Sequence, residues 1–231
     1  YWYLMYFNDL QTLNSDAKYT IPKPDIIAIN GKAMRNIMEN AGYQPEDLID
    51  VEALRYLHLN KIIKKYKSHS VAMANNKLLV LGDYKPNITK SLLLLLNQLD
   101  KSLLLKYYIL FKNHPAVDPI NKELYPNLFL HETNLHLSKL LPTVDVVLSS
   151  INTAAAIESF AAGLPVITVL DNYSFNASPL RVENGAIFVS TSLELKNEME
   201  TLLNKSSGQM KNDYFWVDSE LPRWKSLLLD N

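Results

Sequence analysis

From residue 77 onward the sequence repeats one arrangement: a short apolar run, a polar turn, and a stretch rich in helix-forming residues. Such apolar runs are typical of strands buried on both faces of a parallel sheet, with the helical stretches as crossovers. The expected strands are Leu78 to Leu81, Tyr107 to Phe111, Leu128 to Leu130, Asp145 to Leu148, Val166 to Leu170 and Ala186 to Val189. The expected helices are Ile88 to Lys106, Leu135 to Leu141, Ala154 to Ala162 and Leu193 to Leu203. This alternation predicts an α/β fold with a Rossmann-like parallel sheet and helices on both faces.

Residues 145–170, DVVLSSINTAAAIESFAAGLPVITVL, form the clearest of these units. The apolar run ends in Ser149 and Ser150, and Asn152 or Thr153 can cap the helix that follows. Such a unit places a helix N-terminus at the carboxyl end of a parallel strand, where free N–H groups and hydroxyls converge. The sequence therefore predicts a phosphate site at this turn, although the same polar residues are more often simple helix caps.

The first 67 residues carry a shorter version of the pattern, with strands expected at 25–29 and 49–51 and helices at 32–41 and 52–65. We interpret them as the end of a Rossmann-like domain, because the chain starts with an aromatic run where termini are usually polar. The small polar residues 68–76 are the expected linker. A second domain would span 77–211, followed by a closing segment, 212–231, with a helix at its end.

Composition narrows the function classes. The 231 residues carry a formal net charge of −1, which gives no indication of a nucleic-acid partner. The chain has no cysteine, so disulfides and thiolate metal sites are excluded. No apolar run is long enough to span a bilayer. His131 and His136 lack the spacing of zinc ligands on a helix, so we expect no bound metal and no cofactor.

The expected strands deliver polar residues to the edge of the sheet where ligands bind in this fold class. The candidates that suit a phosphate are Gly82, Lys112, His114, Ser149, Ser150, Asn152 and Thr153. The candidates that suit a nucleoside are Glu132, Thr133 and Glu158. Asp83 also follows the first strand, without an assigned role. Two alternatives stay open: His114 is equally compatible with a bond to the backbone, and Glu158 with a surface charge.

Three sequence features resemble the GT-B-fold glycosyltransferases of bacterial surface carbohydrate biosynthesis, which make O-antigen and capsule. They are an N-terminal set (Pro24-Asp25, Asn30-Gly31, Gly42-Tyr43 and residues 51–56, VEALRY), the pair His114-Pro115 with Ser149-Ser150, and a C-terminal tail, residues 218–224 (DSELPRW). The second feature also resembles bacterial sialyltransferases, in which His and Ser contact the phosphate of a CMP-sugar. The resemblance implies that residues 77–211 bind the sugar donor and that residues 1–67 are the end of the acceptor-side domain.

The resemblance implies a metal-independent glycosyltransferase that takes a CMP- or UDP-linked sugar as substrate and a glycan or glycolipid as acceptor. It implies a cytoplasmic protein and allows peripheral association with the inner face of the membrane. No catalytic base is evident, so we expect the chain to bind donor without necessarily catalysing transfer by itself. The alternatives are an enzyme like sugar-nucleotide 2-epimerases, which share the fold and phosphate site, and a non-catalytic module that binds nucleotide or a partner.

Overall fold

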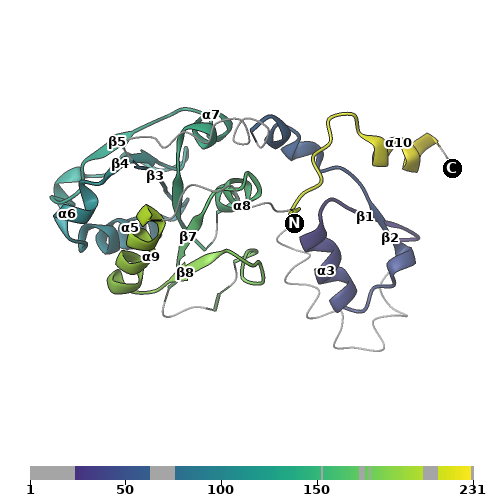
Figure 1. Cartoon of the computed structure of the whole chain (residues 1–231), viewed down its shortest axis with the longest axis horizontal. Helices are drawn as coiled ribbons and strands as arrows, with labels where there is room; N and C mark the ends of the chain where they lie inside the picture. The colour runs from purple at the N-terminus through teal and green to yellow at the C-terminus, as the bar shows by residue number, and fades with distance from the viewer. Residues whose placement is uncertain are drawn as a thin grey trace. The chain divides into compact units, whose positions relative to one another are not determined.

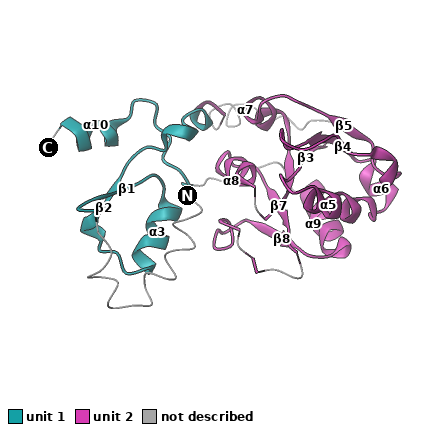
Figure 2. Cartoon of the chain, turned by 180° about the vertical axis from the view of Figure 1, so that it is seen from behind, with its two compact units in different colours: residues 1–60, 212–231 teal, residues 61–211 magenta. Residues whose placement is uncertain are grey.

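The computed structural model describes residues 24–62, 76–151, 153–171, 175–176, 178–204 and 213–229 (Figure 1). Most of the expected linker at 68–76 lies outside the described residues, as does Asn152. The chain forms two compact units (Figure 2). Unit 1 comprises residues 1–60 and 212–231, and unit 2 comprises residues 61–211. The C-terminal segment thus belongs to the same unit as the N-terminal residues.

Unit 2 is built on a six-stranded sheet whose order is β5-β4-β3-β6-β7-β8. Every neighbouring pair is parallel. The strands are β3 (Asn76–Leu81), β4 (Tyr107–Lys112), β5 (Leu130–Glu132), β6 (Val146–Ser150), β7 (Val166–Val169) and β8 (Ile187–Val189). The predicted α/β class with a Rossmann-like parallel sheet is therefore confirmed.

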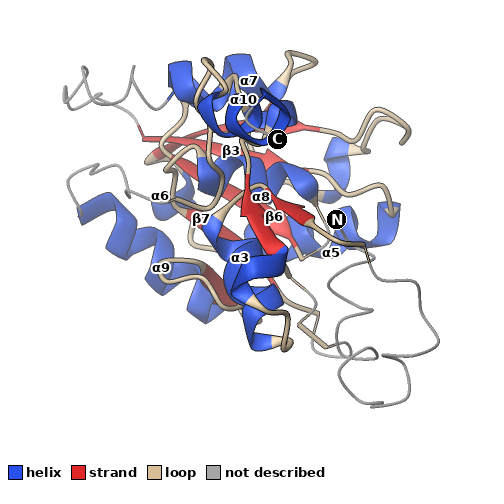
Figure 3. Cartoon of the chain, turned by 90° about the vertical axis from the view of Figure 1, so that its right-hand side faces the viewer, coloured by secondary structure: helices blue, strands red, loops and turns tan. Residues whose placement is uncertain are grey.

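Helices cover both faces of this sheet, as Figure 3 shows with helices in blue and strands in red. The helices are α5 (Pro86–Asn97), α6 (Lys101–Leu104), α7 (Leu137–Leu140), α8 (Ala154–Ala161) and α9 (Ser192–Asn204). Buried leucines of α5 and α6 and two residues of α9 pack with Leu78, Val80 and Leu148 in one apolar core. In Figure 1, α8 lies on the side of the sheet opposite α5 and α9. Alternate strand residues thus face two apolar layers, which explains why the strands read as unbroken apolar runs.

Several element boundaries differ from the predictions. The single helix expected over 88–106 is two helices, α5 and α6, because the chain leaves helical geometry at Asp100. At the end of α5 the carbonyl of Asn97 accepts a hydrogen bond from the Asn127 side chain, at 3.0 Å. β5 begins two residues later than expected, at Leu130. Tertiary contacts, which the local pattern does not encode, set these ends.

Helix α9 begins with a reciprocal cap. The Glu194 carboxylate accepts hydrogen bonds from the N–H groups of Ser190, at 2.6 Å, and Thr191, at 3.1 Å. The Thr191 hydroxyl accepts one from the N–H of Glu194, at 3.2 Å. This T-x-x-E capping box satisfies free helix N–H groups at both ends of the turn. The backbone hydrogen bond from Ser190, followed by that from Thr191, lowers the pKa of Glu194.

Unit 1 contains a small parallel β-α-β unit: β1 (Ile27–Ile29), α3 (Lys32–Asn40) and β2 (Leu48–Asp50). The C-terminal segment crosses the carboxyl edge of this unit, where the backbone N–H of Trp216 donates to the Asn30 carbonyl, at 3.2 Å. A Cβ on Gly31 would lie 1.8 Å from the carbonyl oxygen of Tyr214. The Asn-Gly pair therefore does more than make a turn, because the glycine leaves room for the returning chain.

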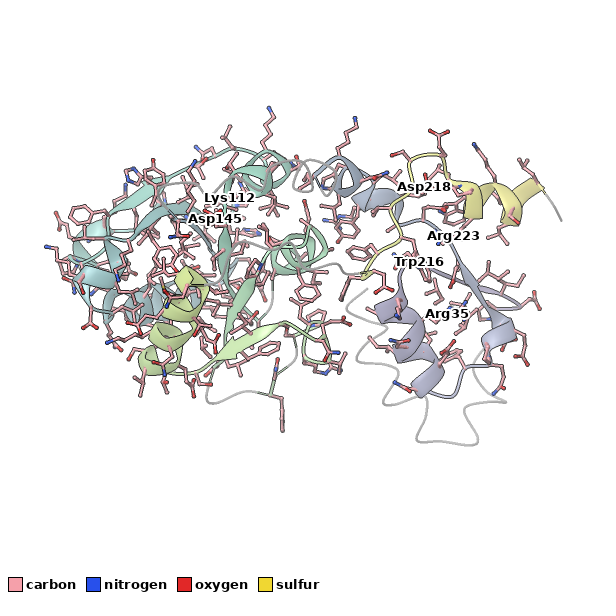
Figure 4. All side chains as sticks on the ribbon, in the orientation of Figure 1. Arg35, Lys112, Asp145, Trp216, Asp218 and Arg223 are labelled. Carbon is pink, nitrogen blue, oxygen red and sulfur yellow. The ribbon has the colours of Figure 1, made fainter. Side chains whose placement is uncertain are left out.

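The same segment ends in α10 (Pro222–Leu229), whose N-terminus is held by Glu52. The buried Glu52 carboxylate accepts hydrogen bonds from the backbone N–H groups of Arg223 and Trp224, both at 3.1 Å. The Glu52 carbonyl accepts a third from the Trp224 indole, at 2.9 Å. The prediction of a helix over 52–65 was wrong at its start: residues 51–53 are irregular, because Glu52 binds the C-terminal segment. Figure 4 labels Trp216, which lies under the Arg223 guanidinium at 5.0 Å.

Candidate functional site

The strand order of unit 2 reverses at the centre of the sheet. The chain builds β3, β4 and β5 outward and then returns to place β6 on the other side of β3. The carboxyl side of this switch point is where ligands bind in open α/β sheets. Gly82 and Asp83 follow β3 at that edge, Lys112 ends β4, and Ser150 ends β6. The topology therefore brings together the polar ends of three neighbouring strands.

Gly82 holds the ends of β3 and β4 close together. Its N–H donates to the carbonyl of Lys112, at 2.9 Å. A Cβ at this position would lie 2.9 Å from Oδ1 of Asn113 and 3.2 Å from its Cα. The close approach that Gly82 permits in the structure is thus that of the neighbouring strand end. A contact between Gly82 and a ligand stays a prediction.

His114 lies two residues beyond the end of β4, partly exposed. Its ring Nδ1 accepts a hydrogen bond from the N–H of Ala116, at 3.2 Å. A neutral ring with this contact carries its proton on Nε2, which leaves a donor for a ligand. The Tyr84 ring stands edge-on to the imidazole, with 6.4 Å between centroids. His114 therefore bonds the backbone with one nitrogen and keeps the other as a potential ligand contact, so both sequence interpretations fit.

Helix α8 begins beside the switch point, directly after β6. Thr153 is its N-cap, as predicted for Asn152 or Thr153: its hydroxyl oxygen accepts from the N–H of Ala155, at 3.2 Å, and its carbonyl from that of Ala156. The hydroxyl proton of Thr153 is not used in the capping bond, so the same group can donate to an anion. A capped helix N-terminus with a spare hydroxyl donor is suited to hold a phosphate.

The two serines lie within β6, which runs two residues further than the strand predicted to end at Leu148. Ser149 is fully buried, and its hydroxyl has no hydrogen-bond partner among the described residues. Its register neighbour on β7, Thr168, is in the same situation. Ser150 is also buried and donates its hydroxyl to Oδ2 of Asp83, at 2.5 Å. A phosphate contact by either serine stays a prediction.

The three predicted nucleoside residues do not lie together. Glu132 and Thr133 are at the end of the edge strand β5, three strand spacings or roughly 14 Å from β6. Glu132 forms an ion pair with Lys122, at 2.8 Å, and the Thr133 hydroxyl accepts from the N–H of Leu135. Glu158 is in α8, half-buried. The nucleoside role of each of the three residues stays a prediction.

Sequence reasoning gave no role to three consecutive residues after β3. The Asp83 carboxylate is buried and accepts both the Ser150 hydroxyl and, at 2.9 Å, the N–H of Lys85. Tyr84 and Lys85 are exposed, with the Lys85 ammonium 5.5 Å from the centre of the Tyr84 ring. The available signal in the sequence was their place directly after a predicted strand. The sequence does not show that this strand is central and borders the switch point, because that depends on the order of the strands in the sheet.

The described part of the chain lacks the features of two other classes of site. No three His, Asp or Glu side chains in it come close enough together to hold a metal ion. No helix in it is long and apolar enough to cross a membrane.

No protein-family model and no curated protein sequence matches the chain. Among solved structures, UDP-GlcNAc 2-epimerase of Methanocaldococcus jannaschii, in complex with UDP-GlcNAc and UDP, matches with a TM-score of 0.51 and 16% identity, over 82% of this chain and 57% of that chain. A variant of the wall teichoic acid polymerase TagF matches with a TM-score of 0.47 and 12% identity, over 84% and 54%. The glycosyltransferase of kitacinnamycin matches with a TM-score of 0.39 and 14% identity, over 58% and 37%.

The chain thus spans little more than half the length of the epimerase and of TagF. At these identities the similarity is one of fold. The epimerase match agrees with the Rossmann-like sheet described above. The match to the epimerase therefore supports the α/β fold described here and no more.

Proposed function

We propose that unit 2 binds a nucleotide sugar and that the protein is a glycosyltransferase of bacterial surface polysaccharide synthesis. The observation that carries this proposal is the position of the α8 N-terminus, which follows the strand beside the switch point. A capped helix start with a spare hydroxyl at Thr153 and an imidazole at His114 is the chemistry that recognises phosphate. The epimerase match supports it, because that protein is described in complex with UDP-GlcNAc and UDP.

In the proposed reaction the bond between the anomeric carbon of the sugar and the phosphate oxygen breaks, and its electron pair stays on the phosphate. The acceptor hydroxyl oxygen forms the new bond to the anomeric carbon, and its proton passes to the departing phosphate or to water. The α8 N-terminus, Thr153 and His114 would stabilise the charge that develops on the departing phosphate, with Lys112 adding positive charge. The chain would do this without a metal ion. The donor would be CMP- or UDP-linked, and the acceptor a glycan or glycolipid at the inner face of the membrane.

The nucleoside would lie along the carboxyl edge of the sheet on one side of the phosphate. Glu158 is the better candidate for the ribose hydroxyls, because it is on the helix that holds the phosphate. Glu132 and Thr133 would then contact the far end of a longer ligand or none at all. A carboxylate can accept hydrogen bonds from both ribose hydroxyls at once. The substitution Glu158→Gln should therefore reduce the affinity for nucleotides more than the affinity for pyrophosphate.

The test is calorimetric titration of the chain with UDP and CMP. His114→Ala should weaken binding about tenfold, since a hydrogen bond to a charged group contributes about 1.5 kcal/mol. Thr153→Ala should weaken it by a similar factor, while Thr153→Ser, which keeps the cap and the hydroxyl, should not. His136→Ala is the control, because His136 caps α7, which follows the edge strand β5. Absence of nucleotide binding by the wild-type chain would refute the proposal.

A second candidate is a sugar-nucleotide 2-epimerase. It is favoured by one observation, the match with a TM-score of 0.51 to UDP-GlcNAc 2-epimerase. Incubation with UDP-GlcNAc, followed by proton NMR of the sugar, separates the two. Inversion at carbon 2 with the nucleotide retained supports the epimerase, whereas release of the nucleotide with transfer to an added glycan supports the transferase. Nucleotide binding with neither reaction would indicate a non-catalytic binding module.

A further inference from the structure

A buried carboxylate lies at the switch point, where the proposed function places phosphate. Asp83 is 2% exposed, and its two oxygens accept hydrogen bonds from the Ser150 hydroxyl and the N–H of Lys85. Its own N–H donates to the Thr89 hydroxyl, at 2.8 Å. Within the described residues, no cationic side chain comes within ion-pair distance of it. Hydrogen bonds alone thus hold a negative charge between β3 and β6.

This contact fixes the polarity of Ser150. A serine hydroxyl has one proton, and that of Ser150 is given to Asp83, at 2.5 Å. Toward any ligand Ser150 then presents only lone pairs. A group that can only accept hydrogen bonds, backed by a carboxylate, is unfavourable for an additional phosphate oxygen carrying negative charge. It is compatible with a hydroxyl of the ligand, which can donate to it.

We propose that Asp83 makes the site discriminate between the sugar-linked donor and the free nucleotide. This inference rests on the proposed function. Each phosphate of a nucleotide sugar is substituted at two of its oxygens and carries one negative charge, whereas the terminal phosphate of a free nucleotide carries almost two at neutral pH. The Asp83 carboxylate opposes that additional charge through Ser150, so the nucleotide product binds less tightly than it otherwise would. Asp83 is therefore a specificity-determining residue that does not itself contact the reacting atoms.

The substitution Asp83→Asn tests the proposal, because it should strengthen the binding of the free nucleotide, whereas most substitutions of a buried residue weaken binding. The substitution removes the negative charge, while the amide oxygen of the new side chain still accepts a hydrogen bond from the Lys85 N–H. The amide nitrogen donates to the Ser150 oxygen, which frees the serine proton for the ligand. We expect UDP to bind about five- to tenfold more tightly and UDP-GlcNAc to change less than about twofold. CMP and a CMP-sugar serve as the second pair of probes. A purely structural role for Asp83 would weaken both ligands together.

Asp145→Asn is the matched control. Asp145 (Figure 4) lies just before β6, at the amino edge of the same sheet, and its carboxylate accepts from the Lys77 N–H, at 2.8 Å. The substitution removes the same charge one strand length away, about 16 Å from Ser150. It should leave the ratio of UDP to UDP-GlcNAc affinity unchanged, and a matching rise there would overturn the assignment to Asp83.

Ser150→Ala provides a second measurement that does not depend on the folding of the Asp83 variant. Because the serine proton is given to Asp83, removing the Ser150 hydroxyl takes no hydrogen bond away from UDP, so UDP affinity should not fall by more than about twofold. A tenfold loss would mean that Ser150 donates to phosphate, which overturns the inference, as would an unchanged affinity ratio in a folded Asp83→Asn. In either case wild-type nucleotide binding persists, so the proposed function stands. A wild-type chain that binds none of the four probes refutes both.

Discussion

Replacing Glu52 by alanine should destabilise unit 1 by about 3 kcal/mol. The Glu52 side chain is fully buried, and its carboxylate accepts the N–H groups of Arg223 and Trp224 and a guanidinium N–H of Arg223, at 3.3 Å. Loss of a helix cap costs about 1 kcal/mol, and breaking a buried ion pair about 3–5 kcal/mol. The Arg223 side chain is 39% exposed and can be solvated by water once Glu52 is removed, so the total cost should stay at the lower end of the ion-pair range, about 3 kcal/mol.

The assay is urea unfolding monitored by tryptophan fluorescence. Both tryptophans of the segment report on the contact, because the Trp224 indole bonds the Glu52 carbonyl and Trp216 lies against Arg223. Glu52→Gln, which keeps the shape and one acceptor oxygen, should lose about half as much stability. Glu220→Ala, an exposed change in the same segment, should stay within about 0.5 kcal/mol of wild type. Amide exchange of the Trp224 indole should quicken in Glu52→Ala. If Glu52→Ala behaves like Glu220→Ala and the indole exchange is unchanged, these contacts do not hold the segment.

Three further predictions concern unit 2. Glu194→Gln should lower stability at pH 7 in thermal melts, and the difference should shrink as the pH falls below about 4.3. The reason is that a lowered pKa contributes stability above the unfolded pKa that is lost as the pH falls through the folded pKa, so a difference that does not change with pH would contradict the cap. Ser149→Ala should raise the free energy of unfolding by up to about 1 kcal/mol, since it removes a buried hydroxyl without a partner. Ser159→Ala, which loses a 2.7 Å bond to the Ala155 carbonyl, should lower it. Gly82→Ala should cost about 1–3 kcal/mol by overpacking against Asn113, and an unchanged melting curve would show that the two strand ends can separate freely.

Much of the unit 2 fold could be predicted, because parallel strands buried on both faces leave continuous apolar runs. All six strands lie within two residues of their expected ends at each side, and Thr153 caps α8 as one of two predicted candidates. The boundaries that moved did so for non-local reasons. The break between α5 and α6 coincides with the Asn97–Asn127 contact, 30 residues apart in the chain. Such contacts have no periodic signature in the sequence.

The sequence by itself determined the fold class and the helix start at residues 153–154, since hydrophobic periodicity and capping are local properties. Only the tertiary structure decided which strand ends are neighbours, because strand order depends on pairings distant in the chain. It set Asp83 against Ser150 across the switch point and so fixed the direction of the serine proton. It also joined Glu52 to Arg223, 171 residues apart in the sequence. A local pattern shows that a residue is polar, whereas the partner that receives its hydrogen bond is chosen by the packing of the whole chain.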